Sequence, residues 1–321
     1  MSVQIFIPTF NRSEKLSRAI RSALSQTFKE IEVVILDNHS EDDTQEVVAA
    51  FKAIDHRITY IRREHNIGMN KNFNAIRTLV TANYFSVLTD DDEYESCFIK
   101  TAMTCFESDS RIKFVACNAP TLINGELLKS QLDTWTEGFY RANTSIFKCI
   151  SGQYPLVTNC LMSAEIANDF IFHQDLGNVG DGLFFTCIFS KYDAYVSKVT
   201  TGYWNNDGQN ASSLYQADPV TLVNYSIRES RHYKNFCQKN HIFMRGLLLL
   251  WLKKFLTVLV ASNQSNFQHV RNKSEMKEVF SLSEVAALWV LDKLKFIHFF
   301  LQALSMFRRV NVFLVSLQEK K

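Results

Sequence analysis

Short apolar runs alternate with amphipathic stretches along the first third of the chain. The apolar runs have the length of strands, and the stretches between them place apolar residues at helical spacing. The predicted strands are Val3–Ile7, Ile31–Leu36, Ile58–Ile61 and Tyr84–Leu88, and the predicted helices are 13–26, 42–53, 70–80 and 96–107. This order is typical of βα units that build a mostly parallel sheet, so we expect an open α/β fold.

Each predicted strand is followed directly by a cluster of polar residues. The clusters are 8–12, 37–40, 62–68 and 89–93. Adjacent parallel strands lie about 4.8 Å apart, and ligands of open α/β sheets bind outside the carboxyl ends of the strands. We therefore expect Asn11, Arg12, Asp37 and the aspartates at 90–92 to meet in one crevice.

The pattern changes after residue 113. A strand-like run at Phe114–Cys117, a turn signal at Asn124-Gly125 and a helical stretch at Val179–Ser190 are mixed with loops. Beyond residue 216 the strand signals disappear, and segments rich in Leu, Phe, Lys and Arg follow. We interpret residues 1–215 as one α/β domain and residues 216–321 as a helical C-terminal region.

The C-terminal region is basic and aromatic. Basic residues outnumber acidic ones by more than two to one in 216–321, acidic residues are in excess before it, and the whole chain has a net charge of +2. Its most apolar segment, Gly246–Val260, is interrupted by Lys253 and Lys254 and is too short on either side for a spanning helix of about 20 residues. Two interpretations stay open: an interfacial helix on an anionic membrane surface, or a helix buried against the α/β domain.

Composition excludes several classes of protein. The 321 residues are 46% hydrophobic and 21% charged, which is ordinary for a globular protein and argues against disorder. The seven cysteines form no C-x-x-C pair and no regular spacing, so neither a zinc module nor a disulfide framework is indicated. The N-terminus enters the first strand without a signal-peptide pattern. We expect a cytoplasmic protein with no nucleic-acid partner.

Three consecutive carboxylates, Asp90, Asp91 and Asp92, follow the fourth predicted strand. Adjacent like charges destabilise a fold unless a cation or ligand compensates them. Mg²⁺ and Mn²⁺ take oxygen ligands, and Mg²⁺ is commonly held by one or two carboxylates together with substrate phosphates. A solvated acidic turn is the alternative. Because no glycine-rich phosphate loop follows the first strand, neutralisation of a diphosphate ligand would fall to a metal.

Residues 5–44, IFIPTFNRSEKLSRAIRSALSQTFKEIEVVILDNHSEDDT, resemble the opening signature of the inverting family 2 glycosyltransferases, which have the GT-A fold. Asn66-Ile67-Gly68 and the run LTDDDEY at 88–94 match further motifs, the latter in the place of the family's DXD-type metal motif. The resemblance makes 1–110 the nucleotide-binding half and 111–215 the acceptor half. It implies transfer of a sugar from a nucleoside-diphosphate donor, with inversion, of the kind that builds bacterial surface polysaccharides.

The resemblance also implies roles for individual residues. The nucleotide-binding set is Pro8, Thr9, Asn11, Arg12, Asp37, Asn66, Gly68, Asn72 and Asp90. Within it, Asp37 is expected to hydrogen-bond the base, expected to be uracil, and Arg12 to shape the pocket for base and ribose. Asp91 is the first choice for binding Mn²⁺ or Mg²⁺, with Asp92 beside it facing the donor sugar.

Transfer also needs a base that deprotonates the acceptor hydroxyl. Asp181, in the run NVGDGLFF, resembles the catalytic aspartate of the family, and Asp175 is the second choice. On spacing alone, Asp181 could instead cap the N-terminus of the helix that follows it, because Asp is a common N-cap.

A later stretch, 203–212, resembles the family motif Y-R-x-H-G-G-x-x-S but departs from it. Trp204 stands at the position of the Arg and Asn206 at the position of the His. Asn is a poor metal ligand, so a weaker metal site is expected here unless Asp207 substitutes. We expect these three residues to contact donor or acceptor.

Two other functions stay open. A sugar nucleotidyltransferase also binds a nucleotide on an α/β sheet with Mg²⁺, but residues 8–12 are not its glycine-rich basic loop. A catalytically silent, glycosyltransferase-like scaffold is kept open by the altered region around Asn206. By resemblance, the partners are a UDP-sugar donor and a saccharide acceptor, expected to be lipid-linked, at the inner face of the cytoplasmic membrane.

Overall fold

The computed structural model describes residues 1–123, 125–206 and 219–241. The predicted turn residue Asn124, the site residue Asp207 and the segment Gly246–Val260 lie outside the described residues, so the interpretations that rest on them stay predictions. Among the helices that are described, none is long and apolar enough to cross a membrane.

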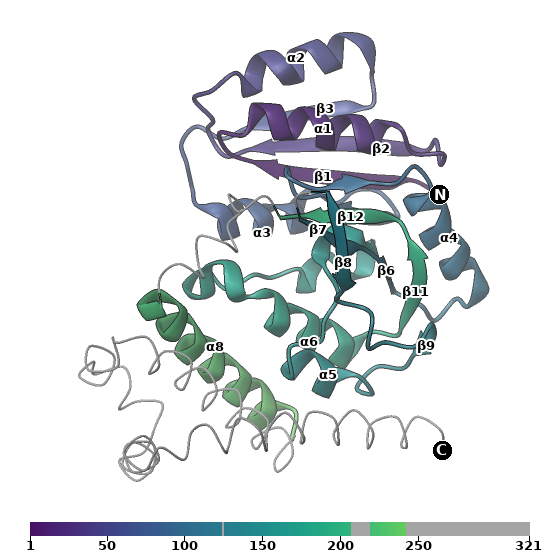
Figure 1. Cartoon of the computed structure of the whole chain (residues 1–321), viewed down its shortest axis with the longest axis vertical. Helices are drawn as coiled ribbons and strands as arrows, with labels where there is room; N and C mark the ends of the chain where they lie inside the picture. Colours follow the sequence, from purple (N-terminus) through teal and green to yellow (C-terminus); the bar gives the residue numbers. More distant parts are fainter. Residues whose placement is uncertain (124, 207–218, 242–321) are drawn as a thin grey trace.

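A mixed sheet with the strand order β3-β2-β1-β4-β10-β6-β11-β9 forms the centre of the fold (Figure 1). Its strands are β1 Val3–Thr9, β2 Ile31–Asp37, β3 Ile58–Arg62, β4 Tyr84–Val87, β6 Phe114–Asn118, β9 Gly138–Tyr140, β10 Cys160–Ser163 and β11 Ala194–Thr200. Strands β3, β2, β1 and β4 are parallel neighbours. The four predicted strands are therefore present, and their carboxyl ends meet at one edge of the sheet. Strand β10 is antiparallel to both β4 and β6.

Helices cover both faces of this sheet. They are α1 Ser13–Leu24, α2 Thr44–Ile54, α3 Met69–Leu79, α4 Phe98–Ser108, α5 Ile146–Ile150, α6 Asp181–Lys191 and α8 Pro219–Lys239, with 3-10 turns η1 Val157–Asn159, η2 Ala164–Asp169 and η3 Gln174–Val179. Alternate residues of a strand point to opposite faces. Ile5 of β1 accordingly belongs to the core under α1, α2 and α4, whereas Phe6 belongs to the core under α3, α5 and α6.

A second sheet brings distant residues to the aspartates. Its strands, in the order β5-β12-β7-β8, are β5 Glu93–Tyr94, β12 Gly202–Asn205, β7 Pro120–Ile123 and β8 Glu126–Ser130. Strand β5 directly follows Asp92 and pairs antiparallel with β12. The end of β12 therefore lies beside the carboxylates that follow β4.

The structure shifts several predicted boundaries by a few residues. Strand β1 continues to Thr9 because Thr9 pairs with Asp37 of β2. The helix predicted at Val179–Ser190 begins at Asp181 as α6, and η3 precedes it. Gly177 has φ 52°, which breaks the helical path at that point.

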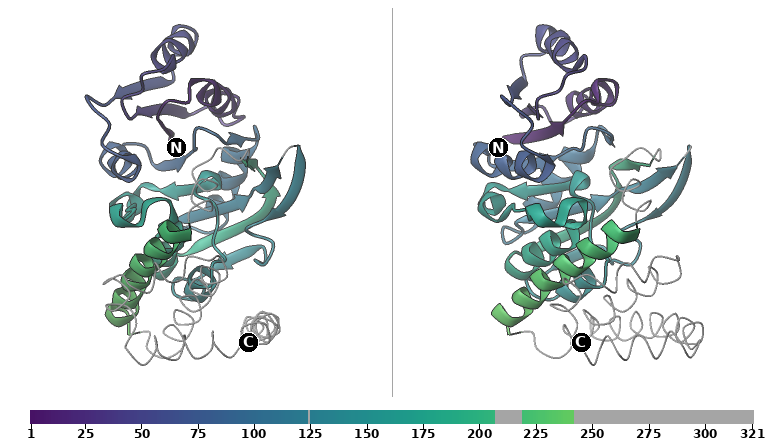
Figure 2. Two further views of the ribbon diagram at one scale, coloured as in Figure 1. Left: turned by 60° about the vertical axis from the view of Figure 1, so that its left-hand side comes forward. Right: turned by 90° about the vertical axis from the view of Figure 1, so that its left-hand side faces the viewer.

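Helix α8, the described part of the predicted helical C-terminal region, packs against η3 and α6 (Figures 1 and 2). Its Tyr233 is fully buried in a cluster with Ile150, Leu176 and Leu183. A helix from late in the chain is thus fixed beside the segment that leads to Asp181.

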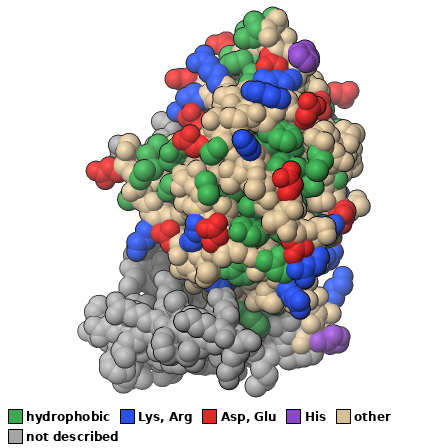
Figure 3. Space-filling model, turned by 90° about the vertical axis from the view of Figure 1, so that its right-hand side faces the viewer, with side chains coloured by type: hydrophobic (Ala, Val, Ile, Leu, Met, Phe, Trp, Pro, Cys, Tyr) green, Lys and Arg blue, Asp and Glu red, His purple; other side chains and the backbone are tan. Residues whose placement is uncertain are grey.

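The face of the molecule in Figure 3 carries acidic and basic side chains intermixed with apolar ones. Nucleic-acid-binding proteins gather their basic residues on one face or stripe. This mixed face does not have that pattern.

Candidate active site

A cavity of about 480 Å³ opens at the carboxyl ends of the parallel strands. This volume is in the range of small-molecule sites. Of the predicted site residues, those that line it are Pro8, Thr9, Arg12, Asn66, Gly68, Asn72, Asp90, Asp91, Asp92, Asp181 and Trp204. Asn11, Asp37 and Asn206 are not among the lining residues. The cavity thus joins residues that precede position 93 with Asp181 and Trp204, which come much later in the chain.

Asp90 is held by residues that follow β1. Thr9 Oγ1 donates to Asp90 Oδ2 at 2.8 Å, and Arg12 Nη1 donates to Asp90 Oδ1 at 3.1 Å. The same Arg12 nitrogen lies 3.0 Å from Asp91 Oδ2. One guanidinium therefore lies between two of the three carboxylates.

Asp92 is held from the opposite direction. Thr89 Oγ1 donates to Asp92 Oδ2 at 2.5 Å, and the backbone N–H of Asn205 donates to Asp92 Oδ1 at 2.9 Å. The side-chain amide of Asn205 also donates to the backbone oxygen of Asp91 at 3.0 Å. Strand β12 thereby fixes the shape of the acidic turn.

The three carboxylates are only partly compensated by these contacts. Burial, and then the charge of Asp91, raise the pKa of Asp90 to about 6 and the pKa of Asp92 to about 8. Arg12 opposes the shift at Asp90. A further cation among these oxygens would relieve the remaining repulsion, and an all-oxygen ligand set fits Mg²⁺ or Mn²⁺. We call Thr89–Asp92 with Thr9 and Arg12 the aspartate wall.

Asp37 is fully buried, and both of its carboxylate oxygens are engaged by the protein. Oδ1 accepts from the backbone N–H of Ser40 at 2.8 Å, and Oδ2 accepts from the Tyr60 hydroxyl at 2.6 Å. Arg62 Nε lies 3.5 Å from the same Oδ2. Asp37 is not among the residues that line the cavity, and its expected contact with a base stays a prediction.

Asn38, the next residue, does line the cavity. Its amide donates to Asn66 Oδ1 at 2.8 Å, and its side-chain oxygen accepts from the backbone N–H of Ile67 at 2.9 Å. Asn66 Oδ1 also accepts from the backbone N–H of Gly68, where φ is 86°. A side chain would be strained at that φ, so glycine suits the turn that starts α3.

Asn11 and Asn72 act on the cavity through the loops that they join. Asn11 adopts φ 52°, and its side-chain oxygen accepts from the backbone N–H of Glu41 at 2.8 Å. Asn72 donates to the backbone oxygen of Leu36 at 2.8 Å. Asn11 thus ties the loop after β1 to the loop after β2, and Asn72 ties α3 to β2.

Asp181 approaches the cavity as the first residue of α6. The N-cap position is occupied by Gly180, and no side-chain cap hydrogen bond is formed there, so the capping role considered for Asp181 is wrong. Burial, and then the charge of Glu229 on α8, raise the pKa of Asp181 to about 7. A carboxylate with a pKa near neutrality is suited to general base catalysis. We call the lining residues Phe172, Gly177 and Asp181, together with Glu229 of α8, the Asp181 wall.

The family model of glycosyl transferase family 2 matches residues 4–169, just over half of the chain. The chain belongs to glycosyl transferase family 2. The family that residues 5–44 predicted is thereby confirmed.

Two curated relatives of this family 2 chain are bacterial. The GalNAc(5)-diNAcBac-PP-undecaprenol beta-1,3-glucosyltransferase of Campylobacter jejuni is 35% identical over 102 residues, which are 32% of this chain and 33% of that protein. The UDP-Glc:alpha-D-GlcNAc-diphosphoundecaprenol beta-1,3-glucosyltransferase WfaP of Escherichia coli is 29% identical over 141 residues, 40% of this chain and 55% of that protein. The chain thus spans from a third to just over half of the length of these relatives.

Solved structures share the fold of this family 2 chain at low sequence identity. Residues 1–349 of S. aureus TarS, in complex with UDP-GlcNAc, match with a TM-score of 0.62 and 18% identity over 86% of this chain and 78% of that one. The mannosyltransferase PcManGT from Pyrobaculum calidifontis, in complex with GDP-Man and Mn²⁺, matches with a TM-score of 0.53 and 13% identity over 90% and 86%. The expected α/β fold of GT-A type is confirmed.

Of the remaining predicted residues of the family 2 chain, Trp204 lines the cavity, whereas Asn206 and Asp175 do not. Trp204 of β12 lines it, whereas the backbone N–H of Asn206 donates to the backbone oxygen of Leu122 at 2.9 Å and continues the second sheet. Asp175, the second choice for the base, is not among the lining residues and accepts hydrogen bonds from His232 instead.

Sequence reasoning missed three residues that matter to the site. Asn38 lies inside a predicted polar cluster, but the nucleotide-binding role was assigned from the sequence to the neighbouring Asp37. Asn70 donates to the backbone oxygens of His173 and Gly177 at 2.9 and 3.0 Å, so it fixes the loop before Asp181. Glu229 gave no signal, because its approach to Asp181 depends on how α8 packs.

Proposed function

We propose that this family 2 chain transfers a sugar from a UDP-sugar to a hydroxyl of a saccharide acceptor, with inversion at the anomeric carbon. The observation that carries the proposal is that Asp181 shares one cavity with the carboxylates of Asp90, Asp91 and Asp92. A base and an acidic metal-binding cluster around one ligand are the two parts that a single displacement of a nucleoside diphosphate needs.

In the proposed reaction, Asp181 accepts the proton of the acceptor hydroxyl as the hydroxyl oxygen bonds to the anomeric carbon. The bond from that carbon to the diphosphate oxygen breaks, and its electron pair leaves with the nucleoside diphosphate. Attack on the face opposite the leaving group inverts the configuration. With a pKa of about 7, Asp181 is a stronger base than an ordinary carboxylate and is still ionised in a useful fraction at neutral pH.

We assign the donor to the aspartate wall. Asp91 and Asp92 are the proposed ligands of Mn²⁺ or Mg²⁺, which when bound would offset the charge of the departing diphosphate. Arg12, 3.0 Å from Asp91, adds a positive charge of the protein's own at the same place. For the base of the nucleotide we propose Asn38 and Asn66, because both line the cavity whereas Asp37 does not.

The names of the relatives support the choice of donor and acceptor. Both curated relatives are named for acceptors joined to undecaprenol through phosphates, and WfaP is named for UDP-Glc. The TarS structure contains UDP-GlcNAc. We extend this to the present chain as a UDP-sugar donor and a lipid-linked saccharide acceptor, used at the cytoplasmic face of a membrane.

The test is a nucleotide-sugar panel on the wild-type chain. We expect one UDP-sugar to raise the thermal midpoint when Mn²⁺ is present, because donor binding stabilises the folded state by mass action. We also expect release of UDP when an undecaprenol-diphosphate-linked saccharide is added. Binding of a donor without release of UDP, from any acceptor tried, would favour the silent scaffold. Pyrophosphate release from UTP and a sugar phosphate would favour the nucleotidyltransferase.

A further inference from the structure

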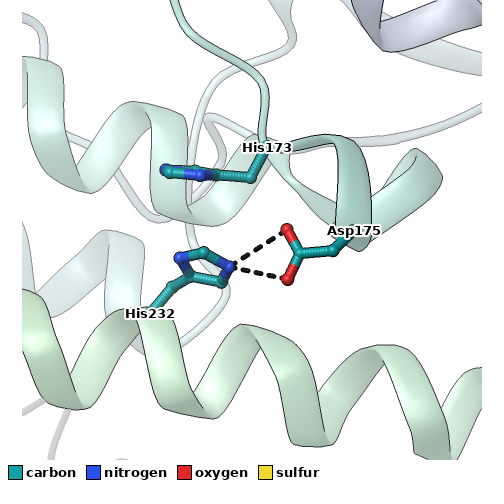
Figure 4. Close-up of side chains that lie close together, drawn as sticks. All are labelled: His173, Asp175 and His232. Carbon is teal, nitrogen blue, oxygen red and sulfur yellow. Dashed lines mark hydrogen bonds and ion pairs between the residues drawn. The ribbon is translucent and has the colours of Figure 1, made fainter.

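Two histidines and an aspartate meet outside the cavity, where α8 crosses η3 (Figure 4). His173 precedes η3, Asp175 lies within it, and His232 projects from α8. One ligand atom of each residue lies within 4.8 Å of the others. Among the described residues, no other group of three or more His, Cys, Asp or Glu side chains meets this distance.

The side chains already converge on a common point. His232 Nε2 lies 3.1 Å from Asp175 Oδ1 and 2.9 Å from Asp175 Oδ2. The ring of His173 lies over the ring of His232 with 4.2 Å between their centroids. Figure 4 shows the carboxylate of Asp175 pointing toward the ring of His232, with the ring of His173 next to that ring.

The donor set differs in kind from the aspartate wall. Two imidazole nitrogens and one carboxylate suit Zn²⁺ and similar borderline cations, whereas oxygen-only sites suit Mg²⁺ and Mn²⁺. In a tetrahedral zinc site, ligand atoms lie about 3.3 Å apart, given metal–ligand bonds of about 2.0–2.1 Å. The three ligand atoms lie within 4.8 Å of one another, so rotation of the side chains is needed to bring them to that spacing, and a tetrahedral ion would keep a fourth position for water.

The surroundings of the cluster agree with cation binding. His173 is partly buried, and its ligand atom lies within 4.8 Å of those of Asp175 in η3 and His232 on α8. The nearby Arg228 Nη1 donates to the backbone oxygen of Asp175 at 3.2 Å, whereas the carboxylate accepts from His232. Asp175 is therefore available as an anionic ligand.

We propose that His173, Asp175 and His232 bind a borderline divalent cation of the Zn²⁺ class, which fastens α8 to the loop that leads to Asp181. The loop is already held on its other side by Asn70 of α3 through the backbone oxygens of His173 and Gly177. Helix α8 carries Glu229, whose charge adds to the burial that raises the pKa of Asp181. A cation at the crossing thus stabilises the contact that sets the environment of Asp181. The proposal does not depend on the sugar that is transferred.

The test is zinc binding to the tag-free, full-length chain, measured by competition with a chromophoric chelator. Wild type is expected to bind one equivalent of Zn²⁺ that survives Asp91→Asn, because that variant alters only the aspartate wall. His173→Ala and His232→Gln are expected to weaken binding by more than about tenfold, since each removes a ligand, and even outer-shell changes cost about 10–100-fold. His56→Ala, which changes an exposed histidine between α2 and β3, is the matched control and is expected to bind as wild type.

A second measurement keeps the proposal falsifiable if a variant folds poorly. His232→Gln retains a side chain that can donate to Asp175, so its far-UV circular dichroism is expected to match wild type. Anomalous diffraction at the zinc edge from wild-type crystals is expected to show a peak between the three side chains. Zinc affinity that is unchanged in both ligand variants, or a peak only at the aspartate wall, would overturn the proposal and leave an ion pair between His232 and Asp175.

Discussion

The two walls of the cavity gather negative charge in different ways. In the aspartate wall, like charges sit on consecutive residues after one strand, and Arg12 already lies between two of them. In the Asp181 wall, one carboxylate starts α6 and the other, Glu229, arrives from α8. Burial and neighbouring charge raise the pKa in both places, but only in the first wall are the carboxylates consecutive in the chain and bridged by a guanidinium. The difference suggests that one wall holds the leaving group and the other takes up a proton.

The largest expected effect comes from removing the base. Asp181→Asn keeps the size of the side chain but cannot accept the proton, so we expect kcat to fall by about 10²–10⁴. Donor affinity, measured by calorimetry with the UDP-sugar and Mn²⁺, is expected to stay within about twofold. Asp169→Asn is the control, because Asp169 pairs with Lys191 away from the cavity. If Asp181→Asn turned over near the wild-type rate, a residue other than Asp181 would be the general base.

Asp91→Asn is expected to disable the aspartate wall instead. The rise in the thermal midpoint caused by Mn²⁺, worth about 2.7 kcal/mol at a hundredfold excess over Kd, should disappear. In Asp181→Asn the same rise should persist. Equal responses of the two variants to Mn²⁺ would contradict the proposal that the cation binds at the aspartate wall and that Asp181 acts only as the base.

The response of wild type to Mn²⁺ should depend on pH. The pKa values of Asp90 and Asp92, about 6 and about 8, lie above the ordinary carboxyl value near 3.9. Raised carboxyl pKa values mean that the folded state binds more protons, so their contribution to the free energy of unfolding falls as pH rises from about 4 to about 8. A cation that binds the ionised carboxylates should therefore stabilise the fold more at pH 8 than at pH 5.5, as measured by thermal melting.

Gly182→Ala is expected to disturb the Asp181 wall through packing alone. A Cβ at this position would lie 2.8 Å from the Tyr233 hydroxyl oxygen and 3.0 Å from Cε1 of Tyr154, so the buried side chain of Tyr233 on α8 would have to move. Overpacking of this kind costs about 1–3 kcal/mol, measurable by urea unfolding. The matched control is Gly180→Ala, whose Cβ would meet nothing nearer than 3.7 Å. Equal stability of the two variants would show that α8 is not tightly packed there.

Glu229→Gln is expected to have the smallest effect, seen only in the pH profile. Removing the charge of Glu229 should lower the pKa of Asp181 from about 7 and move the acid limb of kcat to lower pH. A carboxylate of pKa 7 is only about 10% ionised at pH 6, so kcat there can rise by at most about tenfold. Glu165→Gln, on an exposed residue paired with Lys113, should leave the profile unchanged. If the acid limb of the kcat profile did not shift, Glu229 would not be affecting the pKa of the catalytic base.

Asp37 and Asn38 show what the polar residues after a predicted strand do and do not predict about a binding site. The sequence placed both residues in the polar cluster after the second strand, and the structure confirms that cluster at the carboxyl end of β2. Which of the two side chains lines the cavity depends on the backbone conformation at the end of β2. Ser40, Tyr60 and Arg62 draw Asp37 inward, and two of these come from β3. A pattern of polar residues cannot separate neighbours whose partners lie on another strand.

By itself, the sequence determined the family, the four parallel strands and the acidic turn of residues 90–92, because these depend on local periodicity and on contiguous motifs. Only the tertiary structure decided that Asp181 shares a cavity with that turn, that Glu229 raises its pKa, and that His232 meets Asp175. Each of these three depends on contacts between residues far apart in the chain. Such contacts follow from the packing of α6 and α8 around buried side chains such as Tyr233, which no local pattern encodes.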